Sequence, residues 1–384
     1  MPKSRKISKS PSLESTAHIG VTTIDKLSEY DLRHIFSFLS FHDKARAAQV
    51  CRHWKSMIYQ APLWEGCFQK IKETADMEIM APSLVERGIT RVALKDVKSV
   101  NKSIYSSKTH SLLHMNRQLN SMIQIMAESL TVVNFDIVRP VGYRVVERIL
   151  SVPMPKLEIL CLGRHFQVQM EAIRNIIANC SNIKCLTILD CKDINNDAIL
   201  QLGTDLKRLR RLAVLNGRNL TDEGFHKLTI HNPQLKALMA CQTGLTDIGI
   251  LCLAQLKSLD MLDLQGCRIT SLCVDILSNA RSKISRLKVS LCADNVLHRI
   301  GRSQLLLTHL TVGCAGCCKA TDAGIDGLLK YGHKHYEHVQ INGLSCISVD
   351  GMMKLAKRLD KLVVLKISNK DMTKEAKEAV ANDK

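Results

Sequence analysis

Ten copies of one apolar spacing run from Leu130 to Leu362, and this regular period limits the folds open to the chain. Each copy reads apolar-x-x-apolar-x-apolar, as at Leu157, Leu160 and Leu162, and the first anchors are 23 to 29 residues apart. Alternating apolar residues predict a short strand with one buried face. The rest of each unit is long enough for a helix that returns the chain, so consecutive strands should pair in parallel. The remaining copies begin at Ile183, Leu209, Leu235, Leu259, Ile284, Leu307 and Tyr336.

A period near 26 residues, with one strand and one helix in each unit, is typical of leucine-rich repeats. We therefore predict an α/β fold, a leucine-rich-repeat solenoid over residues 72–384 with about ten repeats. Its parallel strands should line the concave face of a horseshoe and its helices the convex face. The return segments show helical spacing, as at Ala172, Ile173 and Ile176.

Three of the predicted helices begin at a threonine–aspartate pair, namely Thr221-Asp222, Thr246-Asp247 and Thr321-Asp322. The threonine side chain can cap the first backbone amides of the helix. The aspartate is expected to lie near the positive end of the helix dipole.

Cysteines recur at the ninth position of the repeats, at Cys191, Cys267 and Cys292. A small, weakly polar side chain fits a buried turn out of the strand. This pattern resembles the cysteine-containing subclass of leucine-rich repeats. Gly217, Thr243 and Leu344 occupy the same position in other repeats, so the pattern is incomplete.

The bulk composition favours an intracellular protein with an aliphatic core. The 384 residues are 46% hydrophobic but only 4% aromatic, as thin stacked repeats require. The first residues are basic and serine-rich with no apolar stretch, so we expect a disordered tail at 1–20 and no secretory signal. Fifteen cysteines then read as reduced thiols, and the expected location is the cytoplasm and/or the nucleus. No apolar run is long enough for a membrane span.

The net charge of +18 has two interpretations, a solvated lysine-rich surface or a surface that attracts acidic partners. Aromatic residues interleaved with the basic ones would favour nucleic acid, and their absence argues against a specific nucleic-acid partner. The sequence has no phosphate-binding glycine loop, nucleophile elbow or H-E-x-x-H helix. We therefore expect no catalytic residues and no cofactor.

A cysteine–histidine cluster near the C-terminal end allows two interpretations. Cys-x-x-Cys with nearby histidines could make a tetrahedral zinc site. The cysteines, however, fall where every repeat turns out of its strand, which favours structural thiols, and we predict no metal site. The cluster consists of Cys314, Cys317, Cys318, His333, His335 and His338.

Residues 21–71 have a different pattern, which predicts three helices. Ser28 followed by Asp31 is a helix-capping signal. A second helix is expected from Asp43 to about Ile58, and a third from Pro62, because proline is favoured in the first turn. So short a module holds little core of its own, and apolar residues left exposed on it would indicate a partner interface.

These residues resemble the F-box, whose order is L-[P]-x-x-x-L-x-x-I-F-x-x-L, then V-C-R-x-W, then L-W. The resemblance implies an F-box domain at 21–71 that binds the Skp adaptor of a cullin–RING ubiquitin ligase, while the repeats bind substrate. Its adaptor-binding residues would be Leu27, Ser28, Leu32, Ile35, Phe36, Leu39, Val50, Trp54, Leu63 and Trp64.

The segments Asp43–Cys51 and Pro82–Val92 and the ending M-T-K-E-A-K-E-A are similar to the partner-of-paired branch of these proteins. That branch recruits transcription regulators for ubiquitination. Two positions depart from the F-box pattern. Ser28 replaces the usual proline, and Asp31 replaces a common leucine and so removes an apolar contact.

Side chains between the anchors should point into the concave face, where a protein substrate could lie. The first half of this strip is small and apolar and the second half is mostly basic. An alternative is that these are ordinary exposed strand residues and that binding occurs elsewhere. The candidate substrate-binding residues are Ile159, Cys161, Cys185, Arg211, Ala213, Met239, Met261, Asp263, Arg286, Lys288, His309 and His338.

Two functions therefore follow from the sequence. The first is a non-catalytic substrate receptor of a Skp–cullin–F-box ubiquitin ligase, with the Skp adaptor, the cullin scaffold and a protein substrate as partners. The second is a protein-binding scaffold whose F-box has lost its adaptor, which the departures at Ser28 and Asp31 would permit.

Overall fold

The computed structural model describes residues 24–72, 75–95, 108–136, 141–164, 166–280, 282–313, 319–331, 335–343 and 347–368. The chain divides into two compact units, and the boundary falls between Glu65 and Gly66. The expected basic tail at 1–20, Cys314, Cys317, Cys318, His333, Leu344 and the M-T-K-E-A-K-E-A ending lie outside the described residues.

The first unit contains short helices joined by tight turns. They are η1 (Ile24–Lys26), α1 (Glu29–Ser37), α2 (Phe41–Ala47), α3 (Arg52–Ile58) and the 3₁₀ helix η2 (Ala61–Trp64). The single helix expected from Asp43 to Ile58 is therefore wrong. The backbone is extended at Cys51, whose sulfur accepts a hydrogen bond from the Trp54 amide and so starts a new helix. The helix expected from Pro62 is only the turn η2.

The core of the first unit is built from its own aromatic residues. Phe36 and Trp54 meet edge to face, with ring centroids 5.1 Å apart. The Trp64 indole is buried and donates a hydrogen bond of 2.6 Å to the Ile58 carbonyl. Lys44 is also buried, and its ammonium group donates to the Leu63 carbonyl at 2.7 Å. These bonds satisfy the polar groups that the core encloses.

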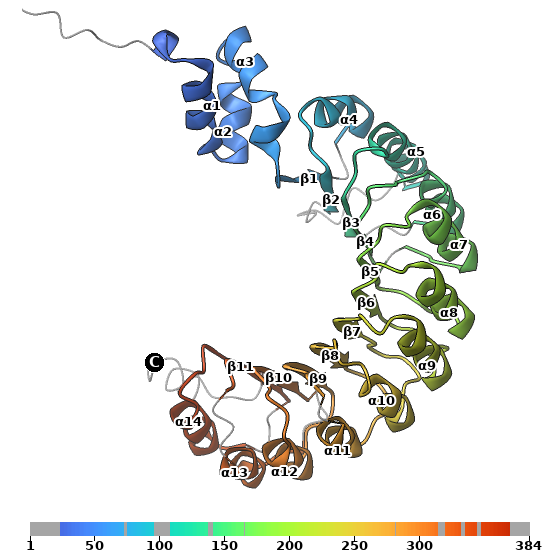
Figure 1. The fold of residues 1–384 in the computed structure, drawn as a ribbon, viewed down its shortest axis with the longest axis vertical. Helices are drawn as coiled ribbons and strands as arrows, with labels where there is room; N and C mark the ends of the chain where they lie inside the picture. The colour runs from blue at the N-terminus through green and yellow to red at the C-terminus, as the bar shows by residue number, and fades with distance from the viewer. Residues whose placement is uncertain are drawn as a thin grey trace, which may run out of the picture. The chain divides into compact units, whose positions relative to one another are not determined.

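The second unit is a solenoid in which one twelve-stranded parallel sheet follows chain order from β1 to β12. Within this unit the strands line the inner side of a curve and the helices its outer side (Figure 1), which confirms the predicted fold class. The strands are β1 (Phe68–Lys72), β2 (Arg91–Lys95), β3 (Val132–Asp136), β4 (Ile159–Leu162), β5 (Cys185–Ile188), β6 (Arg211–Val214), β7 (Ala237–Met239), β8 (Met261–Leu264), β9 (Arg286–Val289), β10 (His309–Val312), β11 (His338–Asn342) and β12 (Val364–Ser368).

The helices of the solenoid alternate with its strands, and their apolar faces are buried. Ala172, Ile173 and Ile176 have almost no exposed surface, as their spacing predicts. The helices are α4 (Met77–Glu86), α5 (Lys108–Met126), α6 (Tyr143–Leu150), α7 (Met170–Asn179), α8 (Asn196–Asp205), α9 (Asp222–His231), α10 (Asp247–Leu253), α11 (Leu272–Asn279), α12 (Asp294–Arg302), α13 (Asp322–Lys330) and α14 (Val349–Arg358).

At five junctions of the described solenoid, a carboxylate or amide at the first helical position joins one repeat to the next on the helical side. Asp222 at the start of α9 accepts hydrogen bonds from the Thr246 amide at 2.8 Å and from its hydroxyl at 2.6 Å. We call this series of bonds the first-turn ladder. The same pairing joins Asn196 to Thr221, Asp247 to Thr270, Asp294 to Thr321 and Asp322 to Ser348.

The ladder revises the roles expected for the threonine–aspartate pairs. Thr246 and Thr321 cap their helices through the hydroxyl, as predicted. Thr221 makes no such cap, because its hydroxyl accepts a hydrogen bond from the Asn196 amide group instead. The side chain of Asp222 bonds the neighbouring repeat, a contact that reading one repeat at a time cannot reveal.

Glycine makes room for the ladder at the third helical position. A methyl group placed on Gly249 would overlap both the Asp222 carboxylate and the Leu245 side chain. Gly224, Gly324 and Gly351 face the ladder residue of the preceding repeat in the same way. The T-D-x-G sequence at three helix starts is therefore the signature of this junction.

Candidate functional site

The first unit exposes large apolar side chains that its own core leaves free. Ile35 is 42% exposed, Phe38 76% and Val50 64%. Tyr30, in the first turn of α1, is exposed as well. Large exposed apolar side chains on so small a unit make it a candidate protein-interaction surface. Phe38 and Tyr30 were not among the predicted adaptor-binding residues. Ile35 and Phe38 are three residues apart, a spacing that would have indicated neighbouring side chains on one side of a helix.

The predicted adaptor-binding residues divide into surface and core. Ser28, Ile35 and Val50 are exposed, whereas Leu27, Leu39 and Trp54 are half-buried. The structure places Leu32, Phe36, Leu63 and Trp64 inside the unit, with Phe36 only 2% exposed. These four residues shape the module and present almost no surface of their own.

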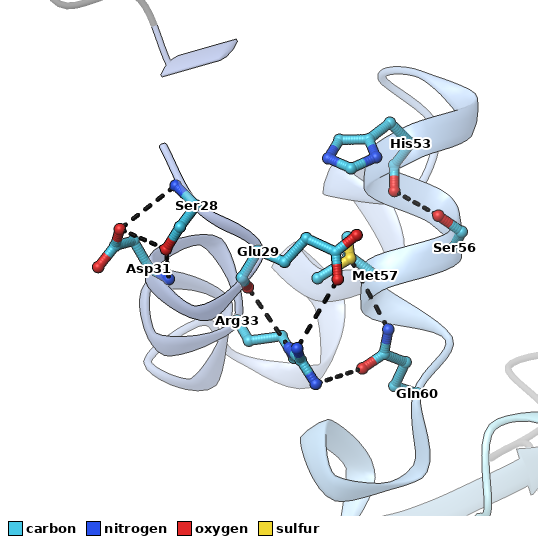
Figure 2. A network of polar contacts seen from close by, with 8 residues as sticks. All are labelled: Ser28, Glu29, Asp31, Arg33, His53, Ser56, Met57 and Gln60. Atoms are coloured by element: carbon cyan, nitrogen blue, oxygen red, sulfur yellow. Dashed lines mark hydrogen bonds and ion pairs between the residues drawn. The ribbon is translucent and has the colours of Figure 1, made fainter. Parts of the chain in front are cut away.

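Ser28 and Asp31 form a reciprocal cap at the start of α1 (Figure 2). The Ser28 hydroxyl accepts from the Asp31 amide at 3.2 Å, and the Asp31 carboxylate accepts from the Ser28 amide at 3.3 Å. The two departures from the F-box pattern are thus one structural feature, because each residue supplies the partner of the other.

A second polar contact in Figure 2 joins α1 to the segment after α3. The Arg33 guanidinium lies between the Glu29 carboxylate and the Gln60 amide oxygen, to which it donates a hydrogen bond of 3.2 Å. This contact links α1, which contains Ile35 and ends just before Phe38, to the segment after α3. The exposed apolar side chains therefore lie on a positioned helix.

On the solenoid, the strand register aligns the candidate substrate residues in two parallel rows. One row contains Ile159, Cys185, Arg211, Ala237, Met261, Arg286, His309, His338 and Val364. The other contains Cys161, Thr187, Ala213, Met239, Asp263, Lys288, Thr311, Gln340 and Lys366. We call the two rows together the concave strip.

Accessibility varies along the strip. Arg211 and Arg286 are exposed, and most of the other members are half-buried. Ala213 is buried, and Asp263 is only 2% exposed. Asp263 therefore offers a partner almost no surface, and its carboxylate accepts a hydrogen bond from the Gln265 amide at 3.2 Å.

The basic half of the strip is partly neutralised by aspartates. Arg286 forms an ion pair with Asp260, and Lys288 lies 3.6 Å from the Asp263 carboxylate. Burial opposes ionisation of Asp260, but hydrogen bonds from Ser285 and Arg286 outweigh it and leave the pKa of this carboxyl below its ordinary value. Arg211 is exposed and has no ion-pair partner in the part of the chain that the structure describes.

The cysteines at the ninth repeat position have a structural role. The buried Cys191 thiol donates to the Ile188 carbonyl at 3.3 Å, and burial raises its pKa to about 12. Thr243 donates to the Ala240 carbonyl at 2.9 Å in the equivalent turn. The thiol and the hydroxyl thus donate the same hydrogen bond, to the carbonyl three residues earlier, which explains why Thr can replace Cys at this position. No two cysteines among the described residues form a disulfide.

None of the helices in the described residues is long and apolar enough to cross a lipid bilayer.

The chain is similar in structure to two solved proteins. The crystal structure of the Rad7 and Elc1 complex in yeast matches with a TM-score of 0.45 at 12% identity, covering 91% of each chain. An internalin (inlF) from Listeria monocytogenes matches with a TM-score of 0.34 at 12% identity, covering 65% of this chain and 77% of that one. The solenoid assignment itself comes from the strand register described above.

A family comparison assigns the N-terminal module. Residues 32–70 match the F-box-like family, and this segment contains most of α1, all of α2 and α3, and the exposed Ile35 and Phe38. The chain therefore carries an F-box-like domain followed by a leucine-rich-repeat solenoid.

Proposed function

We propose that this protein is the substrate-recognition subunit of a Skp–cullin–F-box ubiquitin ligase. The F-box-like domain binds the Skp adaptor and through it the cullin scaffold, and the solenoid binds a protein marked for ubiquitination and proteasomal degradation. The observation that carries the proposal is the exposed apolar side of an F-box-like domain, at Ile35, Phe38 and Val50.

Such a receptor performs no bond chemistry itself. It holds substrate lysines close to a charged ubiquitin-conjugating enzyme and so raises their effective concentration. Transcription regulators are the proposed substrate class, because parts of the sequence resemble the partner-of-paired branch. The proposed location is the cytoplasm and/or the nucleus, where these ligases act.

Adaptor binding is tested with the full chain and purified Skp adaptor by isothermal titration calorimetry. Ile35→Asp and Phe38→Asp should each weaken binding at least tenfold, because each would place a charge in an apolar interface. Ile248→Asp is the matched control, since Ile248 is 68% exposed on α10 of the solenoid. Unchanged affinity in both F-box variants would contradict the proposal.

The second candidate is a protein-binding scaffold that no longer uses an adaptor. The observation that favours it is the exposed Asp31 carboxylate on the same helix as Ile35. Ser28→Pro combined with Asp31→Leu restores the F-box pattern and separates the two candidates. A decayed F-box would acquire binding only in this variant, whereas a working receptor already binds the adaptor in its natural sequence.

We propose the concave strip as the surface that holds the substrate. Its first half presents small apolar side chains around Cys161 and Cys185, and Arg211 next to them supplies a positive charge that has no ion-pair partner among the described residues. A segment with an apolar stretch and one acidic or phosphorylated group would complement this arrangement.

Arg211→Glu is a cleaner test of the strip than charge reversal at Lys288, because a new carboxylate at Lys288 would face the buried Asp263. In proximity labelling with and without proteasome inhibition, Arg211→Glu should lose the proteins that accumulate with the natural chain. Labelling of the Skp adaptor should persist. Retention of the same accumulating proteins would exclude Arg211 as a substrate contact.

A further inference from the structure

Two histidines lie side by side on adjacent strands of the solenoid. His309 on β10 and His338 on β11 are direct register partners. Their imidazole rings are stacked, with centroids 4.2 Å apart and an interplanar angle of 14°.

A carboxylate completes the cluster. Glu337 precedes His338 directly, and its backbone amide is bonded to the Thr308 carbonyl of the preceding repeat at 2.8 Å. One potential ligand atom from each of His309, Glu337 and His338 can be chosen so that all three lie within 4.8 Å of one another. No other group of three such residues lies this close in the described part of the chain.

The hydrogen bonding around His309 indicates which ring nitrogen is available. The Thr308 hydroxyl lies 2.9 Å from His309 Nδ1 and 3.3 Å from the Ser285 carbonyl. A hydroxyl that donates to the Ser285 carbonyl is able to accept the proton of Nδ1–H, and we assign it this role. Nε2 then carries the free lone pair. A histidine ligand held through its other nitrogen is the usual arrangement at metal sites in proteins.

We propose that His309, His338 and Glu337 form a binding site for a divalent transition-metal ion of the Zn²⁺ class. Two imidazoles and one carboxylate are a ligand set that zinc accepts, with the fourth position open to water. Ligand atoms around zinc are about 3.4 Å apart, given bonds of about 2.1 Å, so the three groups need only small side-chain rotations.

The surrounding charges are compatible with a bound cation. Arg286 is the nearby cation, and its charge is paired with Asp260. Glu337 adds a negative charge at the site itself.

This site is distinct from the zinc site considered from the sequence, because it uses two histidines and no cysteine. Co²⁺ as a probe separates the two. Nitrogen and oxygen ligands in a tetrahedral site give visible d–d absorption, whereas thiolate ligands add an intense charge-transfer band in the near ultraviolet. We expect the chelator-treated full chain to bind one Co²⁺ with visible bands and without the thiolate band, and Zn²⁺ to displace it.

The variants His309→Gln and His338→Gln should each weaken Co²⁺ binding at least tenfold, and circular dichroism should show an unchanged fold because both rings are only half-buried. His335→Gln is the matched control, since His335 is exposed and is not one of the three proposed ligands His309, Glu337 and His338. A thiolate band, no binding by the natural chain, or unchanged binding in the double variant His309→Gln/His338→Gln would each overturn the proposal.

Thr308 provides a test of positioning. Thr308→Ser keeps the hydroxyl and should retain the metal affinity, whereas Thr308→Val removes it and should weaken binding about tenfold. Nuclear magnetic resonance of the histidine rings checks the same point, because His309 should carry its proton on Nδ1. A proton on Nε2 in the metal-free chain would contradict the arrangement.

Discussion

The carboxylate of Asp222 receives both the amide and the hydroxyl hydrogen bonds of Thr246, which lies in the next repeat. One side chain thus satisfies a helix start that belongs to its neighbour. Five such pairs in the described solenoid connect repeats on the side opposite the sheet.

Removing this carboxylate should destabilise the solenoid. In Asp222→Ala the Thr246 amide loses a charged acceptor in a half-buried position, and we expect the free energy of unfolding to fall by about 2 kcal/mol. Urea unfolding followed by circular dichroism measures the change. Glu223→Ala, which removes an exposed ion pair with Lys227, should change the midpoint far less. Equal effects of the two variants would show that the ladder contributes nothing.

Gly249→Ala should also destabilise the solenoid, because the added methyl group overlaps the Asp222 carboxylate and Leu245. We expect a loss of about 1–3 kcal/mol, as for other overpacked sites. The matched control is Gly142→Ala, since nothing lies within 4 Å of a methyl group there. The double variant Asp222→Ala/Gly249→Ala should lose less than the sum of the two single losses. Full additivity would mean that the glycine is not there to admit the carboxylate.

The cap at Ser28 should stabilise the F-box-like domain. Ser28→Ala leaves the Asp31 amide without its acceptor and should cost about 1 kcal/mol. Ser56→Ala is the control, because Ser56 donates only to a carbonyl one turn back in its own helix. The thermal midpoint of the domain should fall in the first variant only. A stable Ser28→Ala variant would show that Asp31 alone suffices at the helix start.

Stability should depend on pH through His309. Its pKa lies below the ordinary value of 6.5, chiefly because of burial, with His338 and Arg286 acting in the same direction and Glu337 and Asp260 opposing them. The unfolded chain therefore binds a proton more readily than the folded one below about pH 6.5. The contribution of His309 to the free energy of unfolding is fully present above the pKa of the unfolded chain. It is lost as the pH drops toward the pKa of the folded chain.

Urea midpoints at pH 7 and pH 5 measure this dependence. The natural chain should lose more stability over the interval than His309→Gln does, because the variant lacks the titrating ring. His335→Gln should behave like the natural chain, since that side chain is exposed. Identical losses in the natural chain and His309→Gln would place the titration at other groups.

The repeats that follow the apolar spacing could be predicted, and the first two could not. Ile89, Val92 and Leu94, in and just before strand β2, have the usual spacing, but Leu130 comes 41 residues after Ile89, and this gap hides the period. Strand β1 pairs Gln69 with Val92, and only Ile71 occupies an anchor position with an apolar side chain. Pairing with β2 supplies the order that its own sequence lacks.

The sequence could predict on which side of a strand the site residues lie, but it could not predict how accessible their side chains are. Strand alternation predicted that Arg286 and Lys288 lie on one side of β9, and both are more exposed there than the buried Leu287 and Val289. Their ion pairs depend on Asp260 and Asp263 in the preceding repeat, and such contacts follow only from the register. In the F-box-like domain, Phe36 and Phe38 are two residues apart, and only the packing of α3 and η2 decides that the first is buried and the second exposed.

Among the described repeats from α8 to α14, the ladder is missing at the junction of α11 and α12, where Ser271 replaces the acidic residue and Ala293 replaces the threonine. A groove of about 940 Å³ lies there, crossed by the Arg299–Asp275 ion pair. Cooperative unfolding of a repeat array passes from neighbour to neighbour, so the weakest junction divides it into blocks. Partial denaturation should therefore split this array beside α11, and limited proteolysis should first release a fragment that begins near β9.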